Sequence, residues 1–273
     1  MYHTPINGIF KYTLKWYIIS SNDVKGADMI PKMELLTALY RKWMRLGVGF
    51  SGTEPSLEEP NLEELIAETS LIGRYDLRLI EGMAGWIQEH GDLINMSLMH
   101  KNIKLADSAV IGLVSDLVCG AAAQKFKKIV KYCTPKTQPE MLVYGSEKSE
   151  ETRTEAVKNE TETNRRWNLY YVNLRIKSDA VFQRSFMLKL NHNLARRALF
   201  GAEMRTEILN YLLEKERSFP AEIARNLGYR YHRVMEDIHG LLRDGALIRH
   251  EAGRKKEITI AKPFADYLRQ IPF

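Results

Sequence analysis

Residues 199–260 constrain the fold of this 273-residue chain most, because their apolar side chains change period at residues that begin or end helices. Residues 205–214 carry four apolar side chains at helical spacing, which predicts an amphipathic helix: Ile208, Leu209, Leu212 and Leu213. Pro220 then favours a helix start and Gly228 a helix end, so a short second helix is predicted over 221–227.

A third helix is predicted over 231–243, where four apolar residues fall at i, i+4, i+7 and i+8: Val234, Ile238, Leu241 and Leu242. Asp244 and Gly245 end it. Two short alternating runs follow, 247–251 and 256–260, around the basic turn 252–255. Alternation interrupted by a glycine-containing turn predicts a β-hairpin.

Three helices followed by a hairpin resemble a winged helix-turn-helix DNA-binding domain of the bacterial and archaeal regulator type. The resemblance is carried by the opening FGAEMRTEILNYLL and the close GLLRDGALIRHEAGRKKEITI. In such domains the N-terminal part of the third helix enters the major groove, and a basic hairpin tip reaches backbone phosphates or the minor groove. The side chains that the resemblance and the outward spacing indicate as DNA contacts are Arg230, His232, Arg233, Glu236, Arg243, Arg249, Arg254, Lys255 and Lys256.

Within this set, Arg233 suits a bidentate contact with guanine, and His232 suits a base or a phosphate. The carboxylate of Glu236 either accepts a hydrogen bond from cytosine or repels the phosphates of the DNA. Residues 199–273 carry thirteen basic and eleven acidic residues, a balance of only +2, which is weak for a DNA binder. A winged helix used for protein contact or dimerisation is therefore a second interpretation. For the basic residues at the tip of the hairpin, the alternative to a DNA contact is an ordinary solvated turn.

The N-terminal half, 1–144, is predicted to be an all-α domain, with a loop at 47–60. The expected helices span 32–46, 62–69, 73–90, 93–101 and 107–132. Small residues on the last helix permit close helix approach and suggested a homodimer. Alternation between Tyr12 and Ile18 is compatible with a strand. Arg74 and Arg78, four residues apart, are interpreted as a salt-bridged helix surface.

Charge changes sharply along the middle of the chain. Residues 145–163 hold six acidic and three basic residues with Val157 as the one large apolar side chain, which predicts a linker or at best a solvated helix. We place the domain boundary here, at 145–164. Residues 165–197 hold eight basic residues and one acid, with interleaved aromatics, a strand expected at 169–176 and a helix at 179–200. They suit either nucleic-acid contact or a solvated face.

Composition and motifs narrow the function further. The net charge of +6 suits an acidic partner, and no apolar run reaches the roughly 18–20 residues that cross a bilayer. Phosphate-binding loops, metal-ligand spacings and nucleophile motifs are missing, so we expect no cofactor, no metal and no enzyme activity. Cys119 and Cys133 lack any paired spacing, which is typical of reduced thiols in a cytoplasmic protein.

The fold class expected is therefore mainly α: an N-terminal helical domain, then a basic connecting segment and a winged-helix domain over 165–273. The expected function is a cytoplasmic DNA-binding transcriptional regulator acting on double-stranded DNA, with the N-terminal domain dimerising, sensing an effector or binding a partner. The alternative is an interaction subunit of a larger defence or toxin–antitoxin complex, with the winged helix as a protein-docking module.

Overall fold

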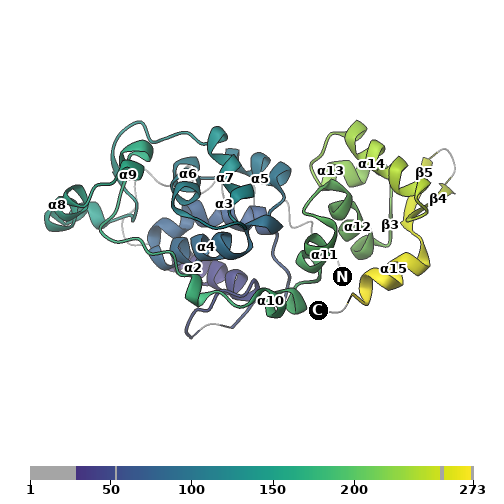
Figure 1. The fold of residues 1–273 in the computed structure, drawn as a ribbon, viewed down its shortest axis with the longest axis horizontal. Coiled ribbons are helices and arrows are strands. Elements are labelled where there is room, and N and C mark those ends of the chain that lie inside the picture. The colour runs from purple at the N-terminus through teal and green to yellow at the C-terminus, as the bar shows by residue number, and fades with distance from the viewer. Residues whose placement is uncertain (1–28, 53, 253–254, 272–273) are drawn as a thin grey trace.

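The computed structural model describes residues 29–52, 54–252 and 255–271 of the chain, and the predicted strand near Tyr12 lies outside them. The described part is mainly α, as predicted (Figure 1). The α-helices before residue 201 are α2 (Met29–Arg45), α3 (Leu62–Ile72), α4 (Leu77–His90), α5 (Met96–Asn102), α6 (Ser108–Leu117), α7 (Gln124–Lys127), α8 (Glu150–Lys158), α9 (Glu162–Trp167), α10 (Arg184–Leu190) and α11 (His192–Phe200).

Short 3-10 helices and a small parallel strand pair connect these helices. The 3-10 helices are η1 (Gly73–Tyr75), η2 (Gly91–Leu93), η3 (Ile103–Leu105), η4 (Lys128–Tyr132), η5 (Ser146–Lys148) and η6 (Ser178–Ala180). The strands are β1 (Glu140–Met141) and β2 (Leu169–Tyr170), with Glu140 opposite Leu169. The loop expected at 47–60 is present over 47–52 and 54–60, apart from an isolated bridge between Val48 and Val181. No helix of the described residues is both long and apolar enough to cross a membrane.

The C-terminal elements follow the predicted order closely. They are α12 (Met204–Lys215), β3 (Arg217–Ser218), α13 (Pro220–Asn226), α14 (Tyr231–Arg243), β4 (Leu247–Ala252), β5 (Lys255–Ile260) and α15 (Lys262–Arg269). Pro220 occupies the first turn of α13, and Gly228 ends that segment with a positive φ of 64°. The strands β4 and β5 form the expected antiparallel hairpin, and the unpredicted strand β3 extends it on the β5 side.

Apolar side chains gather in two separate clusters. The first joins helices from α2 onward and continues through Trp167, Leu169 and Met187 as far as Ala195. The second begins at Ile208 and ends at Leu268. The change of cluster therefore falls near α11, and not in the acidic stretch 145–164 where we placed the boundary. Residues 165–195 pack on the N-terminal helices because their aromatic and aliphatic side chains complete that core.

The acidic stretch is helical. Of the two interpretations of residues 145–163, the solvated helix is the one observed: Ser149 caps α8, its hydroxyl accepting from the Thr152 amide. Ala156 is the one buried side chain of α8. Helix propensity and the N-terminal cap therefore stabilise α8, because the helix has no substantial apolar face to bury.

Three predicted helices are interrupted. The helix expected over 73–90 is divided at Asp76, whose backbone is extended between η1 and α4. The helix expected over 107–132 ends at Leu117, because Val118 is extended and Gly120 has a φ of 89°; α7 and η4 then form separately. The helix expected over 179–200 is divided at Asn191, whose side-chain amide donates to the carbonyls of Arg45 and Met187. The strand predicted at 169–176 is limited to Leu169 and Tyr170.

A small residue of α6 allows close packing within a single chain. Gly112 lies so close to the indole ring of Trp167 that a β-carbon there would overlap the ring. The Trp167 Nε1 donates to Asp116 one turn further along α6, at 2.7 Å. The observation that suggested a dimer, small side chains on 107–132, is therefore explained in part by packing inside one chain.

The basic segment 165–197 is largely neutralised by acids of the N-terminal helices and their loops. Arg184 binds Asp92 through two hydrogen bonds of 2.7 Å, and Lys177 lies 2.7 Å from Glu81. Arg165 and Arg166 pair with Glu160 and Asp116. These pairs hold the segment against the helical core, although the cations in them remain between 37% and 67% exposed.

Arg74 is buried, which corrects the interpretation of 74–78 as a helix surface. Its guanidinium is paired with Asp107 at 2.9 Å and Glu140 at 3.0 Å, and it lies over the Tyr144 ring. The opposing charges raise its pKa although burial alone would lower it. Only Arg78, paired with Asp76, forms the expected surface pair. Arg74 thus holds the β1 segment against α6.

Candidate nucleic-acid interface

The helix α14 presents one apolar and one polar side. Val234 and Ile238 are buried in the second cluster, and Leu242 is half-buried. Helical spacing then turns His232, Glu236 and Arg243 outward, and all three are exposed. The outward ridge predicted for a recognition helix therefore exists on α14. Arg230 precedes this ridge as the exposed, extended N-cap residue.

Arg233 is exposed but paired with an acid on the same helix. Its Nη1 lies 3.0 Å from Glu236 Oε2, and both side chains are 62% exposed. A pair this exposed contributes little to stability, at most about 1 kcal/mol. An incoming anion therefore competes for Arg233 at small cost. The same geometry places a negative charge beside the residue expected to read a base.

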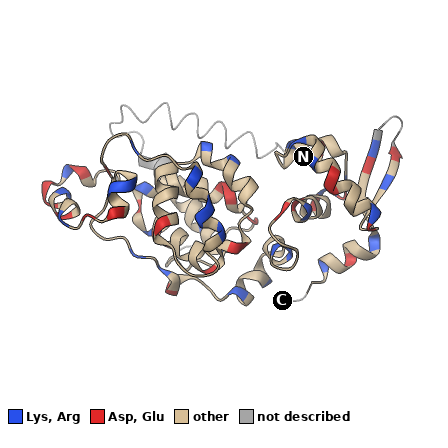
Figure 2. Cartoon of the chain, turned by 45° about the horizontal axis from the view of Figure 1, so that its top comes forward, with Lys and Arg blue, Asp and Glu red and all other residues tan. Residues whose placement is uncertain are grey.

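The hairpin carries the second group of predicted contacts. Arg249 on β4 and Lys256 on β5 are exposed, and Lys256 lies 4.0 Å from Glu251. Arg243, at the end of α14, lies 3.6 Å from Asp244. Arg254 and the side chain of Lys255 lie outside the described residues. Figure 2 shows both signs of charge on the hairpin strands, in keeping with the weak charge balance of this half.

A groove of about 520 Å³ separates α13 and α14 from the hairpin. Arg249 and Lys256 line it, together with Arg225 on α13 and Tyr231 at the start of α14. The remaining lining residues are mostly apolar or come from the start of α13: Phe219, Pro220, Ala221, Glu222, Met235, Ile238, His239 and Ile258. The predicted hairpin contacts thus face a different surface from the outward ridge of α14.

The turn between α13 and α14 rests on the N-terminal helices. Lys101 of α5 donates to the Leu227 carbonyl at 3.4 Å, and its ammonium lies 3.8 Å from the centre of the Tyr229 ring. Burial lowers the pKa of Lys101 and raises that of Tyr229. Sequence reasoning missed Lys101, because nothing local in α5 signals a contact more than a hundred residues away.

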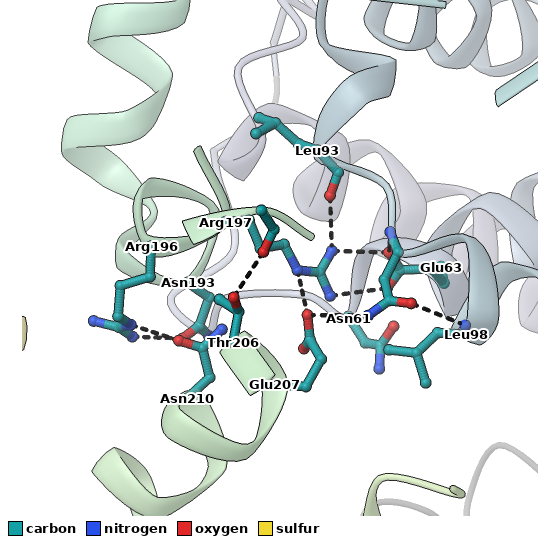
Figure 3. A network of polar contacts seen from close by, with 12 residues as sticks. Asn61, Glu63, Leu93, Leu98, Asn193, Arg196, Arg197, Thr206, Glu207 and Asn210 are labelled. Atoms are coloured by element: carbon teal, nitrogen blue, oxygen red, sulfur yellow. Dashed lines mark hydrogen bonds and ion pairs between the residues drawn. The ribbon is translucent and has the colours of Figure 1, made fainter. Parts of the chain in front are cut away.

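Arg197 fixes the junction between the two apolar clusters (Figure 3). Its guanidinium contacts Glu63 of α3 at 2.8 Å, Glu207 of α12 at 2.7 Å and the Leu93 carbonyl at 3.2 Å. Burial alone would lower its pKa, but the two carboxylates outweigh that effect and raise it. Arg197 therefore connects the helical core to the first helix of the C-terminal half.

The adjacent Arg196 extends this junction on the other side of α11. It donates to Asn193 at 2.6 Å and to Asn210 of α12, as Figure 3 shows. Burial lowers its pKa. Side chains of α11 thus hold α12, on which α14 packs, in one orientation relative to the N-terminal helices.

His90 is a buried titratable group with half of its hydrogen-bonding capacity unmet. Its Nε2 lies 3.2 Å from the Phe182 carbonyl, while Nδ1 is buried without a hydrogen-bond partner among the described residues. Burial lowers the pKa of His90, and the charge of Arg184 acts in the same direction. The neutral tautomer with the proton on Nε2 fits these contacts.

We expect this histidine to make the fold less stable in mild acid. Because its folded-state pKa is below the ordinary 6.5, the unfolded chain binds the proton first, and stability falls as pH drops below about 6.5. His90→Gln keeps a donor for Phe182 and should flatten this decline between pH 7 and 5. Urea unfolding at both pH values measures it, with the exposed His239→Gln as control. An equal decline in all three proteins would contradict the assignment.

Comparisons with models of known protein families, with curated proteins and with solved structures found no match. Within the described residues, no group of three or more histidine, cysteine, aspartate or glutamate side chains is placed to hold a metal ion.

Proposed function

We propose that this protein binds double-stranded DNA through its C-terminal half, as a winged-helix transcriptional regulator. The observation that carries the proposal is the exposed ridge of α14, which follows α12 and α13 in the expected order and precedes a basic hairpin. In this arrangement the first turns of α14 enter the major groove, and the hairpin tip lies along the phosphate backbone.

Arg233 would supply most of the sequence preference. It lies in the first turn of α14, where a guanidinium can donate twice to the O6 and N7 of guanine. Glu236 holds that guanidinium in the free protein and would release it to the base. His232 would contact a neighbouring base or phosphate, and Arg230 and Arg243 would contact phosphates.

The expected result for Arg233→Ala is a loss of about 1–3 kcal/mol on the preferred sequence, together with weaker discrimination between sequences. Glu236→Gln should instead tighten binding to all sequences, because it removes an anion near the phosphates and frees Arg233. Lys255→Ala should weaken binding to all sequences and reduce the salt slope by about one unit, as loss of one phosphate contact implies. Fluorescence anisotropy at two salt concentrations, on sites chosen by selection from random DNA, measures all three.

Lys148→Ala is the matched control, because Lys148 is an exposed cation two residues before α8, the helix at the opposite end of the molecule (Figure 1). It should leave DNA affinity and the salt slope unchanged. Equal losses for Arg233→Ala and Lys255→Ala on every sequence would reduce the proposal to unspecific electrostatic attachment. If neither variant loses DNA affinity while both keep a native circular dichroism spectrum, the proposal that α14 binds DNA is contradicted.

A further inference from the structure

Residues 93–139 of the N-terminal helices carry a concentration of lysines that the proposed DNA contacts of α14 and the hairpin do not include. This stretch holds seven lysines, no arginine and only two acids, Asp107 and Asp116. Both acids are already paired, since Asp107 is buried against Arg74 and Asp116 binds Arg166. The positive charge of the stretch is therefore not cancelled by its own acids.

Four of these lysines have no ion-pair partner among the residues that the structure describes, and we call them the lysine patch: Lys104, Lys127, Lys128 and Lys131. Lys127 is half-buried, and the other three are exposed. Phe126 and Ile129, three residues apart, are buried in the first apolar cluster. Lys128 and Lys131 have the same spacing on η4, so they share its outward side.

Side-chain contacts place the lysine patch close to the start of α14. The Lys101 ammonium of α5 lies 3.8 Å from the centre of the Tyr229 ring, in the turn that precedes α14. The neighbouring His100 packs on Tyr132 of η4, with the two ring centres 3.9 Å apart. Lys104 follows Lys101 by one turn. The helix α5 thus connects the turn before α14 with η4, and α7, α5, α13 and α14 lie in a row in Figure 1.

We propose that the lysine patch binds the phosphate backbone of the same DNA duplex, beyond the bases that α14 contacts. The inference rests on the proposed function and adds to it a second contact surface, on the N-terminal helices. These helices lie to one side of α14 (Figure 1). The duplex is therefore contacted past one flank of the α14 site and not past the other.

The residue types of the patch suit phosphates rather than bases. A lysine ammonium is a compact charge with rotatable donors, whereas the planar guanidinium of arginine suits a bidentate contact with a base edge. Contacts from lysines alone raise the affinity for every sequence and leave discrimination to α14. Tyr132 already packs against His100, so one face of its ring is not open to an unpaired base. A double-stranded backbone is therefore favoured over a single strand.

A fixed junction lets the two surfaces act on one duplex. The buried pairs of Arg197 with Glu63 and Glu207 hold the C-terminal half against the N-terminal helices. Duplex DNA is itself stiff, with a persistence length of about 50 nm. Two surfaces in fixed relative positions can therefore meet phosphates of the same duplex without the entropic cost of ordering a flexible linker between them.

Duplex length separates the lysine patch from α14 in an experiment on the full chain. Fluorescence anisotropy is measured on the preferred site alone, and on that site lengthened by about 20 base pairs, two helical turns, on either flank. The wild-type protein should bind one lengthened duplex more tightly than the other two. Lys128→Ala/Lys131→Ala should remove much of that gain and reduce the salt slope on the favoured duplex by about two units, roughly 0.9 for each lost phosphate contact. Lys104→Ala should reduce it by about one unit.

The matched control is Lys148→Ala/Lys158→Ala, which removes the same charge from exposed positions at α8 and should equal wild type on all three duplexes. Arg233→Ala should weaken binding to all three, because each contains the α14 site. If it does so while the patch variants behave like the control, this inference fails and the proposed function stands. An equal loss for the patch variants on the site alone would also overturn the inference. A chain that binds none of the duplexes would overturn both.

Discussion

Arg197→Met is expected to lower the free energy of unfolding by about 3–5 kcal/mol, the cost typical of removing one partner from a buried ion pair. Glu63 is fully buried and Glu207 is 7% exposed, so both carboxylates would lose the cation that compensates their burial. The Leu93 carbonyl would lose a donor as well. Methionine fills much of the space, which limits the cavity contribution. Chemical denaturation monitored by circular dichroism measures the change.

The control for this prediction is Arg233→Met, which removes an arginine from an exposed pair and should change stability by less than about 1 kcal/mol. A second test separates the orphaned charge from lost packing. Adding Glu207→Gln to Arg197→Met should recover part of the loss, because one buried anion is then neutral. A double variant as unstable as the sum of the single changes would show that packing, and not charge, dominates at this junction.

Gly112→Ala should destabilise the first apolar cluster by about 1–3 kcal/mol or more, the usual cost of forcing an extra carbon into a packed core. The added β-carbon would overlap the six-membered ring of Trp167, which is itself buried and anchored to Asp116. The indole would have to leave its site, and α9 and β2 would move with it. Thermal unfolding and tryptophan fluorescence report stability and indole environment together.

A double-mutant cycle with Trp167→Leu identifies the cause. Trp167→Leu alone should be costly, since it removes a buried ring. In that background Gly112→Ala should cost much less, because the overlapping atoms are gone and alanine favours a helix over glycine. Additive effects would mean that Gly112 is needed for some reason other than contact with Trp167.

The sequence by itself determined the elements whose pattern is local. The bounds of α14 and the two strands of the hairpin follow from apolar periods of about 3.6 and 2, bounded by glycine, and both were predicted. The exposed side of α14 follows from the same period, so the positions of His232, Arg233, Glu236 and Arg243 were predictable. Their role in binding DNA remains a prediction.

Only the tertiary structure decided how the charged and small residues are used. The cations of 165–197 look available in the sequence, but Asp92, Glu81 and Glu63 lie too far along the chain for any local pattern to pair them. The predicted boundary at 145–164 reflected a real change in composition. The core nevertheless continues to Ala195, because burial of Trp167 and Met187 against distant helices outweighs local polarity. Local periodicity encodes an element and its faces, whereas contacts distant in sequence decide which faces remain uncovered.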